Sequence, residues 1–426
     1  MEQTMTVNLA VLACPGGEVF ADEMINHLKK MYRHSFKKQA AALARRYCLD
    51  IETAGSRINF VNDVISHSLH GGQDRGKCRT PGFRVPARFT HFSNGEIKAE
   101  ILESIRGKDI YIVQDVENRY PVNFSGKDDK RILSVNDHLM TIFVTVDAAK
   151  YAGAEHITLV LPVYPYARQH KAKGREGLTA SRVGKILENL GVNHIITLDI
   201  HSRDIVLSFN RMRLENLHAS YQTIRCLSMM NGILNDDFVV VSPDTGAVDR
   251  NKFYANALKK PLNLLYKERD YSKISRNAQE SNITELKLLG DVRGKTVFMA
   301  DDMLDTGGTL LKGMKMLKES GAGKVIAAIS LPLFSGDAIN YFDTAYREGL
   351  FYRIIGTNAI YQEELLTKEW YISVNISKLF AQTISRLHQN QSISSLLDNR
   401  EIITKLLADS QPPLPLQNSL FDTEPE

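Results

Sequence analysis

The chain has 426 residues, of which 43% are apolar and 24% charged, and its formal net charge is +4. This length predicts two or three compact domains, and the composition is that of an ordinary globular protein. The small net charge argues against nucleic-acid binding, and no apolar run approaches the roughly 18 residues of a membrane span. The N-terminus lacks a basic segment ahead of a long apolar one, so we expect no signal peptide.

The four cysteines, Cys14, Cys48, Cys78 and Cys226, are scattered along the chain and form no C-x-x-C pair. This spacing gives neither a zinc site nor a disulfide framework. It is typical of proteins in a reducing compartment, so we expect a cytoplasmic protein.

Apolar runs of strand length alternate with amphipathic segments of helical period along the whole chain. Such alternation predicts an α/β fold with parallel sheets covered by helices on both faces. The pattern restarts after Phe209, which indicates two similar halves. Strands are predicted at 7–12, 110–113, 157–163, 194–200, 238–241, 262–266, 297–300, 324–330 and 350–356, and helices at 18–31, 136–151 and 179–190.

The restart also sets the expected domain boundaries. We expect an N-terminal half at 1–216, a C-terminal half at 217–388, a return to the first half at 389–397, and a tail at 398–426. The tail carries six acidic and two basic residues with a proline-rich stretch, which predicts a frayed helix and then a disordered end. Polar loops are expected near 118–133 and at 270–284, the second of them mobile.

One segment differs from the rest in charge. Residues 29–88 hold thirteen Lys/Arg and four Asp/Glu, a formal charge of +9, so the remainder of the chain carries −5. Residues 35–47 have helical spacing with basic residues between the apolar ones, and 71–88 are rich in Gly, Arg and Pro. The favoured interpretation is an inserted surface helix and loop. Binding of nucleic acid or of an acidic partner is the alternative, because such a cluster is also an electrostatic footprint.

The most informative stretch is 296–310, TVFMADDMLDTGGTL, in which an apolar run leads to acidic residues and then to a helix pattern. A strand, a short polar turn and a helix form a ligand site at the carboxyl end of a strand in an open α/β sheet. Glycines and helix-start N–H groups suit a phosphate monoester, and adjacent carboxylates suit ribose hydroxyls or Mg²⁺. A plain turn with an N-cap aspartate is the structural alternative. The candidate residues are Asp301, Asp302, Asp305, Thr306, Gly307, Gly308 and Thr309.

Two candidate nucleotide contacts precede this stretch. Phe92, Asn94 and Glu96 occupy every second position and would share one side of an extended segment, where they could stack on and hydrogen-bond to a purine. Packing of the aromatic ring before a turn is the alternative. Arg168 and Gln169 lie in a dense basic loop after a predicted strand, a favourable place for polyphosphate.

His201 and Asp244 each follow a predicted strand, one in each half of the chain. An imidazole and a carboxylate can share a Mg²⁺ ion that is held mainly by substrate phosphates and water. His201 taken alone is equally compatible with a hydrogen-bonded core histidine.

Seven segments together carry a resemblance. In chain order they are FSNGE, RGKDIYIVQ, YPYARQHKAKGREGLTASRV, ITLDIHS, VVVSPDTGA, LLYKERD and ADDMLDTGGTL. Their order and spacing resemble the ribose-phosphate pyrophosphokinase family, the synthetases of 5-phosphoribosyl 1-diphosphate (PRPP), which have phosphoribosyltransferase-like domains. The resemblance runs from about residue 7 to 397, interrupted around 29–88 and 118–133.

The resemblance implies an activity and a cofactor. The family transfers a diphosphate from ATP to ribose 5-phosphate, releases AMP and supplies PRPP for nucleotide biosynthesis. Mg²⁺ is the implied metal, with His201 and Asp244 as its ligands, and Lys267 and Arg269 are the implied basic pair of a flexible catalytic loop.

The resemblance also implies substrate contacts and an assembly. Phe92, Asn94 and Glu96 would bind adenine from a neighbouring subunit, so a homo-oligomer, hexameric or dimer-based, with shared active sites is implied. Arg168 and Gln169 would contact the ATP phosphates. Asp301 and Asp302 would contact the ribose, and 305–309 would hold the 5-phosphate.

The sequence departs from the family pattern at three positions. His170 stands where Asp is usual, Gly177 where Pro is usual, and Ala247 where a second Gly is usual. A non-catalytic regulatory homologue and a plain phosphoribosyltransferase are the competing interpretations. The first would tolerate loss of Lys267 or His201, which are both present, and the second leaves the FSNGE and YARQ segments unexplained.

Overall fold

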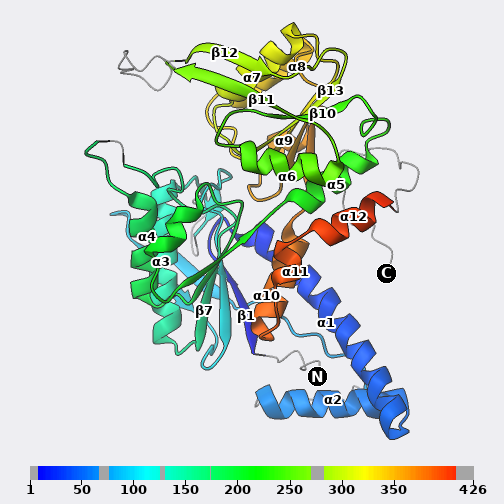
Figure 1. Ribbon diagram of the computed structural model, residues 1–426. Coiled ribbons are helices and arrows are strands. Elements are labelled where there is room, and N and C mark those ends of the chain that lie inside the picture. Colours follow the sequence, from blue (N-terminus) through cyan, green and yellow to red (C-terminus); the bar gives the residue numbers. More distant parts are fainter. Residues whose placement is uncertain (1–7, 67–75, 125–129, 173, 270–282, 409–426) are drawn as a thin grey trace. The chain divides into compact units, whose positions relative to one another are not determined.

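The computed structural model describes residues 8–66, 76–124, 130–172, 174–269 and 283–408 (Figure 1). The chain divides into two compact units. The first unit is Met1–Leu217 with Ser377–Leu397, and the second is His218–Ile376 with Asp398–Glu426. None of the helices in the described ranges is long and apolar enough to cross a membrane.

The first unit is built on a parallel five-stranded sheet in the order β1-β4-β7-β8-β9. Most residues of the four strands β1, β4, β7 and β8 are buried, which explains their nearly continuous apolar sequences. The predicted strands in this half are therefore present, shifted by a few residues at their ends. The strands are β1 (Leu9–Ala13), β4 (Asp109–Val113), β7 (His156–Val160), β8 (His194–Leu198) and β9 (Arg213–Leu217).

Helices and two small hairpins complete the first unit. The Ser134 side chain and Asp137 form a capping box at the start of α3, which fixes where this helix begins. The elements are α1 (Glu18–Tyr47), α2 (Ile51–Ser66), α3 (Val135–Tyr151), α4 (Thr179–Leu190), the 3-10 helix η1 (Arg203–Ser208), α10 (Ser377–His388), α11 (Ser394–Leu397), the hairpin β2 (Ala87–His91) with β3 (Ile97–Ile101), and the hairpin β5 (Val122–Asn123) with β6 (Lys130–Arg131).

In its described residues, 29–66 and 76–88, the basic segment contains two helices instead of the single one expected. α1 runs without a break for 30 residues, so the helix predicted at 18–31 and the helical spacing at 35–47 belong to one element. α2 then packs against α1, and the chain returns to hydrogen-bond with β1, where Val11 N–H donates to Phe83 O (2.7 Å) and Val85 N–H donates to Val11 O (2.8 Å). Residues 83–85 therefore belong to the main fold.

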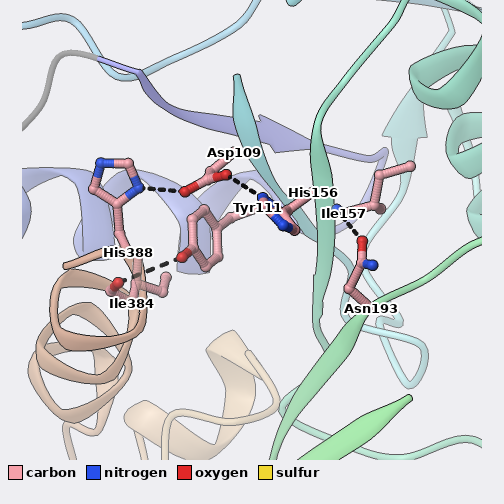
Figure 2. Close-up of polar contacts among 7 residues, drawn as sticks. All are labelled: Asp109, Tyr111, His156, Ile157, Asn193, Ile384 and His388. Atoms are coloured by element: carbon pink, nitrogen blue, oxygen red, sulfur yellow. Dashed lines mark hydrogen bonds and ion pairs between the residues drawn. The ribbon is translucent and has the colours of Figure 1, made fainter. Parts of the chain in front are cut away.

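The chain returns to the first unit at Ser377, earlier than the expected residue 389, because α10 packs against α1. Phe20 and Phe380 meet edge to face with ring centroids 5.2 Å apart. Figure 2 shows a polar tie at the other end of α10, where His388 Nδ1 lies 2.6 Å and His156 Nδ1 lies 2.9 Å from the two carboxylate oxygens of Asp109. Tyr111 Oη also donates to Ile384 O (3.5 Å).

The second unit has a seven-stranded sheet in the order β12-β11-β10-β13-β14-β15-β16. All neighbours are parallel except the edge strand β12, which pairs antiparallel with β11. The expectation of two parallel α/β domains is confirmed, with this one antiparallel edge as an addition. The strands are β10 (Phe238–Ser242), β11 (Leu262–Arg269), β12 (Ile283–Leu289), β13 (Thr296–Leu304), β14 (Val325–Pro332), β15 (Arg353–Thr357) and β16 (Tyr371–Val374).

Alternate residues of the central strands enter two separate apolar cores. Val297 and Met299 of β13 pack with α7 and α8 on one face, whereas Phe298 and Ala300 pack with α5, α6 and α12 on the other. Helices therefore cover both faces of this sheet. The helices are α5 (Ser220–Met229), α6 (Val248–Leu258), α7 (Gly308–Glu319), α8 (Ala338–Arg347), α9 (Glu363–Leu366) and α12 (Arg400–Ala408).

The start of the tail is part of this second core. Ile403 of α12 is 1% exposed and joins the cluster formed by α5, α6 and the sheet. The helix expected in the tail is thus present and packed. Residues 409–426 and 270–282 lie outside the described residues, so the expectations for the end of the tail and for a mobile loop are not addressed by the structure.

The hydrogen bonds between Asp109 and the two histidines should affect the stability of the fold. Burial raises the pKa of the Asp109 carboxyl, but hydrogen bonds from His388 and His156 outweigh it and hold the pKa below its usual range. A lowered pKa stabilises the fold above the unfolded value of about 4, and this contribution is lost as pH falls through the folded value. Asp109→Asn should therefore cost about 2 kcal/mol of unfolding free energy at pH 7.

Urea unfolding at a series of pH values from 7 to 3 measures this cost. The difference between the variant and the parent should begin to shrink below about pH 4, because the unfolded parent chain takes up a proton at Asp109 before the folded one does. Asp236→Asn is the matched control, since the Asp236 side chain is fully exposed and 4.0 Å from Lys260. A cost for Asp109→Asn that is the same at pH 7 and pH 3 would contradict the explanation.

Candidate functional site

Strand β13 of the second unit carries the two candidate carboxylates. The strand extends to Leu304, pairing Asp301 with Ile329 and Met303 with Leu331 of β14. Asp301 and Asp302 thus lie among the last residues of the strand. The sequence had suggested that they follow its end. Their positions are fixed by backbone pairing as well as by the local loop, so this part of the candidate site is on a rigid element.

Asn251 of α6 fixes the backbone just before these carboxylates. Its Nδ2 donates to Ala300 O (2.8 Å) and to Ala247 O (2.9 Å), and its Oδ1 accepts from Ala300 N–H (2.9 Å). Asn251 is completely buried, so its amide replaces water as the partner of these groups. Sequence reasoning missed Asn251, because a lone asparagine inside a helix gives no signal of a contact 49 residues away.

The Asp301 carboxyl lies among protein atoms and other acidic groups. Burial, then the neighbouring Asp302 and finally Asp244, raise the pKa of Asp301 to about 7, and Arg250 opposes part of this rise. A carboxyl with such a pKa is protonated in a substantial fraction of molecules at neutral pH. It can therefore donate as well as accept a hydrogen bond, which suits a pair of adjacent hydroxyl groups.

Asp244 follows β10, which is hydrogen-bonded to β13. The Asp244 Oδ1 atom accepts from the backbone N–H groups of Gly246 and Ala247, each at 3.0 Å, and Ser242 Oγ donates to Asp244 O (2.7 Å). This carboxylate therefore orders the turn before α6. Because β10 and β13 are parallel neighbours, their carboxyl ends bring Asp244 close enough to Asp301 to raise its pKa.

The loop 305–309 joins β13 to α7. Gly307 has a φ of +72° and a Cβ there would lie 2.3 Å from Phe342 Cε2, so only glycine fits. Gly308, the first residue of α7, is exposed and has no atom within 4 Å of a Cβ position. Thr306 and Thr309 are also exposed. The loop thus presents the start of a helix and open space, which is the arrangement that an oxyanion requires.

Lys267 and Arg269 lie on β11, where Lys267 is the backbone partner of Leu286 and Arg269 that of Ile283. The strand was expected to end at residue 266. It continues because β12 pairs with it, with an irregularity between Glu268 and Arg269. The polar stretch that follows, 270–282, lies outside the described residues.

The Phe92 to Glu96 segment of the first unit is a turn. Phe92 N–H donates to Glu96 O (2.8 Å) and Gly95 N–H donates to Phe92 O (3.0 Å), which closes the hairpin between β2 and β3. The expectation of an extended segment with three side chains on one side is therefore wrong. The reason is Gly95, whose φ of +94° permits the reversal. Phe92, Asn94 and Glu96 are all exposed, and Phe92 is 44% exposed.

The basic loop after β7 is held against α4. Tyr164 Oη donates to Ala180 O (2.9 Å), Gln169 N–H donates to Tyr166 O (2.8 Å), and Ala180 N–H donates to Gln169 O (3.3 Å). Arg168 and Gln169 are exposed at its tip. The backbone of this loop is thus ordered while these two side chains face solvent.

His170 and His201 meet in the loops that follow the neighbouring strands β7 and β8. Their rings are edge to face, with centroids 5.1 Å apart at an interplanar angle of 70°. Sequence reasoning placed His201 at a strand end but did not expect His170 beside it. His201 is exposed, so it is not the buried core histidine of the alternative interpretation.

The donors present suit a divalent cation that is bound mainly by other ligands. Among the described residues, no group of three or more His, Cys, Asp and Glu side chains is arranged to hold a metal ion. The acidic pair Asp301 and Asp302 nevertheless carries unfavourable repulsion that a cation would relieve. His201 in the first unit and Asp244 in the second are each of a type that binds Mg²⁺ together with phosphates and water, and their role as ligands stays a prediction.

Comparisons with known proteins agree for both units. Residues 82–191 match the model of the N-terminal domain of ribose phosphate pyrophosphokinase, and residues 213–337 match that of the phosphoribosyl transferase domain. A ribose-phosphate pyrophosphokinase of Listeria ivanovii is 36% identical over 313 residues, covering 72% of this chain and 88% of that protein. One of Nostoc sp. is 32% identical over 367 residues, covering 85% and 98%.

The fold has a relative among solved structures. The crystal structure of phosphoribosylpyrophosphate synthetase from Mycobacterium smegmatis is similar with a TM-score of 0.64 and 25% identity. The similarity covers 90% of this chain and 99% of that one. Both units of the present chain are therefore included in the likeness.

The two loop glycines give a matched pair of variants. Gly308→Ala should fold normally, because its Cβ enters open space, but should lose at least about tenfold in affinity for a phosphate monoester, since a methyl group would occupy the space of the anion. Gly307→Ala should lower the melting temperature, because its Cβ would clash with Phe342. Thermal unfolding and equilibrium binding measure the two effects separately. Unchanged binding by folded Gly308→Ala would assign the loop a purely structural role.

Proposed function

This chain belongs to the ribose-phosphate pyrophosphokinase family, and from that premise we propose how its residues make PRPP and AMP from ATP and ribose 5-phosphate. The observation that carries the proposal is the placement of Asp301 and Asp302 on β13 directly before the glycine loop that starts α7. A paired carboxylate site and an oxyanion site are thus joined on one strand-loop-helix unit, which matches a ribose that carries a 5-phosphate.

Ribose 5-phosphate would bind entirely within the second unit. The backbone at 305–309 and the hydroxyls of Thr306 and Thr309 would hold the phosphate, and Asp301 and Asp302 would hold the ribose hydroxyls. Because the pKa of Asp301 is raised to about 7, this residue can donate to one hydroxyl and accept from another. The Asn251 amide would preserve the spacing between the carboxylates and the loop.

ATP would bind through residues of the first unit. The exposed Phe92 ring would stack on adenine, and Asn94 and Glu96 would hydrogen-bond to the base. Arg168 and Gln169 would contact the phosphates from the ordered loop after β7. Because the Phe92 to Glu96 hairpin is exposed, we further propose a homo-oligomer in which it contributes to a site on a neighbouring copy.

The reaction moves a diphosphate group. The anomeric hydroxyl oxygen of ribose 5-phosphate forms a bond to the β-phosphorus of ATP, the bond from that phosphorus to the bridging oxygen of the α-phosphate breaks, and AMP leaves with that oxygen. The hydroxyl proton is released. Such a transfer depends on in-line positioning and on neutralising charge that spreads over the phosphoryl oxygens.

Cations of this chain would neutralise that charge. Lys267 and Arg269 would contact the transferred group, and His201 and Asp244 would hold Mg²⁺. The metal, when bound, polarises the phosphates of ATP. A phosphoribosyltransferase would use only the second unit, whereas the family model of the N-terminal synthetase domain matches the first.

Incubation with Mg-ATP and ribose 5-phosphate tests the proposal directly. Equal amounts of AMP and PRPP are expected. Formation of ADP would indicate transfer of a single phosphoryl group, and no turnover by folded protein would favour a non-catalytic homologue.

The basic pair yields a quantitative prediction. Contacts made only in the transition state change turnover, and loss of one such donor typically costs roughly 10²–10³ in rate, about 3–4 kcal/mol. Lys267→Ala and Arg269→Ala should each lose at least that much kcat with modest changes in ATP affinity. The double variant should be less than additive, because both residues act on one bound state.

Lys315→Ala on α7 is the control for removal of a lysine charge, because Lys315 is exposed and outside the predicted contacts. Steady-state kinetics together with equilibrium ATP binding separate turnover from affinity. A folded Lys267→Ala enzyme that turns over within about threefold of the parent would show that this residue contributes no transition-state contact.

His201→Ala should weaken the use of Mg-ATP far more than binding of ribose 5-phosphate. The reason is that His201 lies in the first unit beside His170, whereas the proposed ribose 5-phosphate contacts lie in the second. A Mg²⁺ titration of activity measures the use of Mg-ATP, and calorimetry measures the binding of ribose 5-phosphate. Full activity across the titration would remove His201 from the metal site.

A further inference from the structure

Residues 29–66 and 76–80 form a helical arm, made of the outer part of α1, the helix α2 and the segment 76–80. Figure 1 shows α1 continuing outward past α10, with α2 turning back from its tip. The arm ends just before residue 82, where the match to the N-terminal domain model begins. None of the residues proposed above for catalysis or substrate binding lies in it.

The arm is a folded element with a core of its own. Phe36, Ala40 and Ile58 are buried against one another, with Leu43 and Cys78 packed around them. Polar contacts fasten the same elements. Asn62 Nδ2 donates to Tyr32 Oη (3.0 Å), Arg79 and Asp63 form an ion pair at 2.8 Å, and Arg33 Nε donates to Thr80 Oγ1 (3.0 Å).

One side of α1 in the arm is a basic stripe. The exposed cations Lys30, Arg33, Lys37, Lys38 and Arg45 are one to seven residues apart along α1, and all but Arg33, which contacts Thr80, lie away from the buried Tyr32, Phe36 and Ala40. No Asp or Glu occurs between residues 24 and 49, whereas seven Lys and Arg do. The stripe on α1 therefore carries only positively charged side chains.

The arm also exposes an apolar surface on α2. Seven residues between 51 and 64 are exposed, and four of them are apolar, whereas single apolar residues are the norm on a free surface. Their exposed fractions are 66% for Ile51, 68% for Phe60, 42% for Val61 and 58% for Val64, and Tyr47 at the end of α1 is 57% exposed. A partner that covers both surfaces must be acidic and must carry large apolar side chains.

The chain itself contains a segment of this composition. Residues 409–426, DSQPPLPLQNSLFDTEPE, hold four acidic and no basic residues, together with Leu414, Leu416, Leu420 and Phe421. They follow α12 directly and, like the arm, lie outside the residues matched by the family models. Eighteen residues can reach up to about 60 Å, several times the roughly 16 Å radius of gyration of a domain of this size.

We propose that residues 409–426 bind to the helical arm, with their acidic residues on the basic stripe of α1 and their leucine and phenylalanine side chains on the exposed apolar face of α2. The binding occurs within one chain or between two copies of it. Nucleic acid is the less suitable occupant, because phosphates would satisfy the stripe but leave the α2 surface exposed.

The first test uses the chain without the segment, residues 1–408, and a fluorescein-labelled peptide of residues 409–426. Fluorescence anisotropy should show saturable binding that weakens as salt is raised, because exposed charges are screened. The full-length protein should bind the peptide at least about tenfold more weakly, since its own segment occupies the arm. No saturable binding to residues 1–408 would overturn the proposal.

Variants locate the peptide. Lys37→Glu with Lys38→Glu, and separately Phe60→Ser, should each weaken peptide binding at least about tenfold, a cost of 1.4 kcal/mol. Lys312→Glu with Lys315→Glu on α7 is the charge-matched control and should have no effect, since both residues are exposed in the second unit. Equal weakening by the control pair would show general charge attraction and overturn the assignment to the arm.

Hydrogen exchange tests the intact protein. Amides of 30–46 and 51–64 should exchange more slowly in the full-length chain than in residues 1–408, and the difference should be independent of protein concentration if binding is within one chain. An equal exchange pattern in the two proteins would overturn the proposal. So would an 18-nucleotide single-stranded RNA that binds residues 1–408 more tightly than the peptide and prevents its binding.

Removal of the arm separates this role from catalysis. The contact between Arg33 and Thr80 shows that the chain comes together there, so a short Gly-Ser linker can replace residues 35–79. Residues 83–85 must stay, because they hydrogen-bond to β1. This variant of the protein without 409–426 should form AMP at the parent rate and bind no peptide. Retained peptide binding would overturn the proposal.

Discussion

Burial of a parallel sheet on both faces is the constraint on which the rest of this structure depends. When alternate strand residues such as Phe298 and Met299 enter two different cores, the strand interior has no room for polar chemistry. Charged side chains are then favoured toward the ends of the strands. In the first unit this edge carries His170 and His201, and in the second it carries Asp244 and the acidic pair of β13. The candidate site residues therefore cluster at strand ends in both units.

The edge is made rigid by contacts that have no part in chemistry themselves. Asn251 fixes the backbone of Ala300 with two hydrogen bonds, and the Asp244 carboxylate orders the turn before α6. Such anchoring is needed because the Asp301 carboxyl is held beside other acidic groups, and their repulsion together with burial raises its pKa. A substrate or cation that relieves this repulsion binds more tightly, because the folded protein already carries the unfavourable interaction among these carboxylates.

Two segments outside the ranges matched by the family models contain none of the proposed catalytic residues. The helical arm extends α1 beyond the contacts that this helix makes with α10, and it builds a small core around Phe36 and Ile58. At the other end of the chain, α12 joins the apolar cluster of the second unit before the acidic segment begins. The arm is therefore folded around its own core in the first unit, and α12 is packed into the core of the second.

Local chemistry explains what the sequence by itself determined. Apolar runs, the loop glycines and the seven family segments predicted an α/β fold in two halves, the strand, loop and helix at 296–310 and the family, because each depends on neighbouring residues. The pairing of His170 with His201 and the Asn251 contact with Ala300 were decided by tertiary structure. Parallel strands join residues far apart in sequence, and hydrogen bonds to distant backbone groups leave no periodic pattern. The continuation of β11 to Arg269 depends likewise on a partner strand that no local propensity reveals.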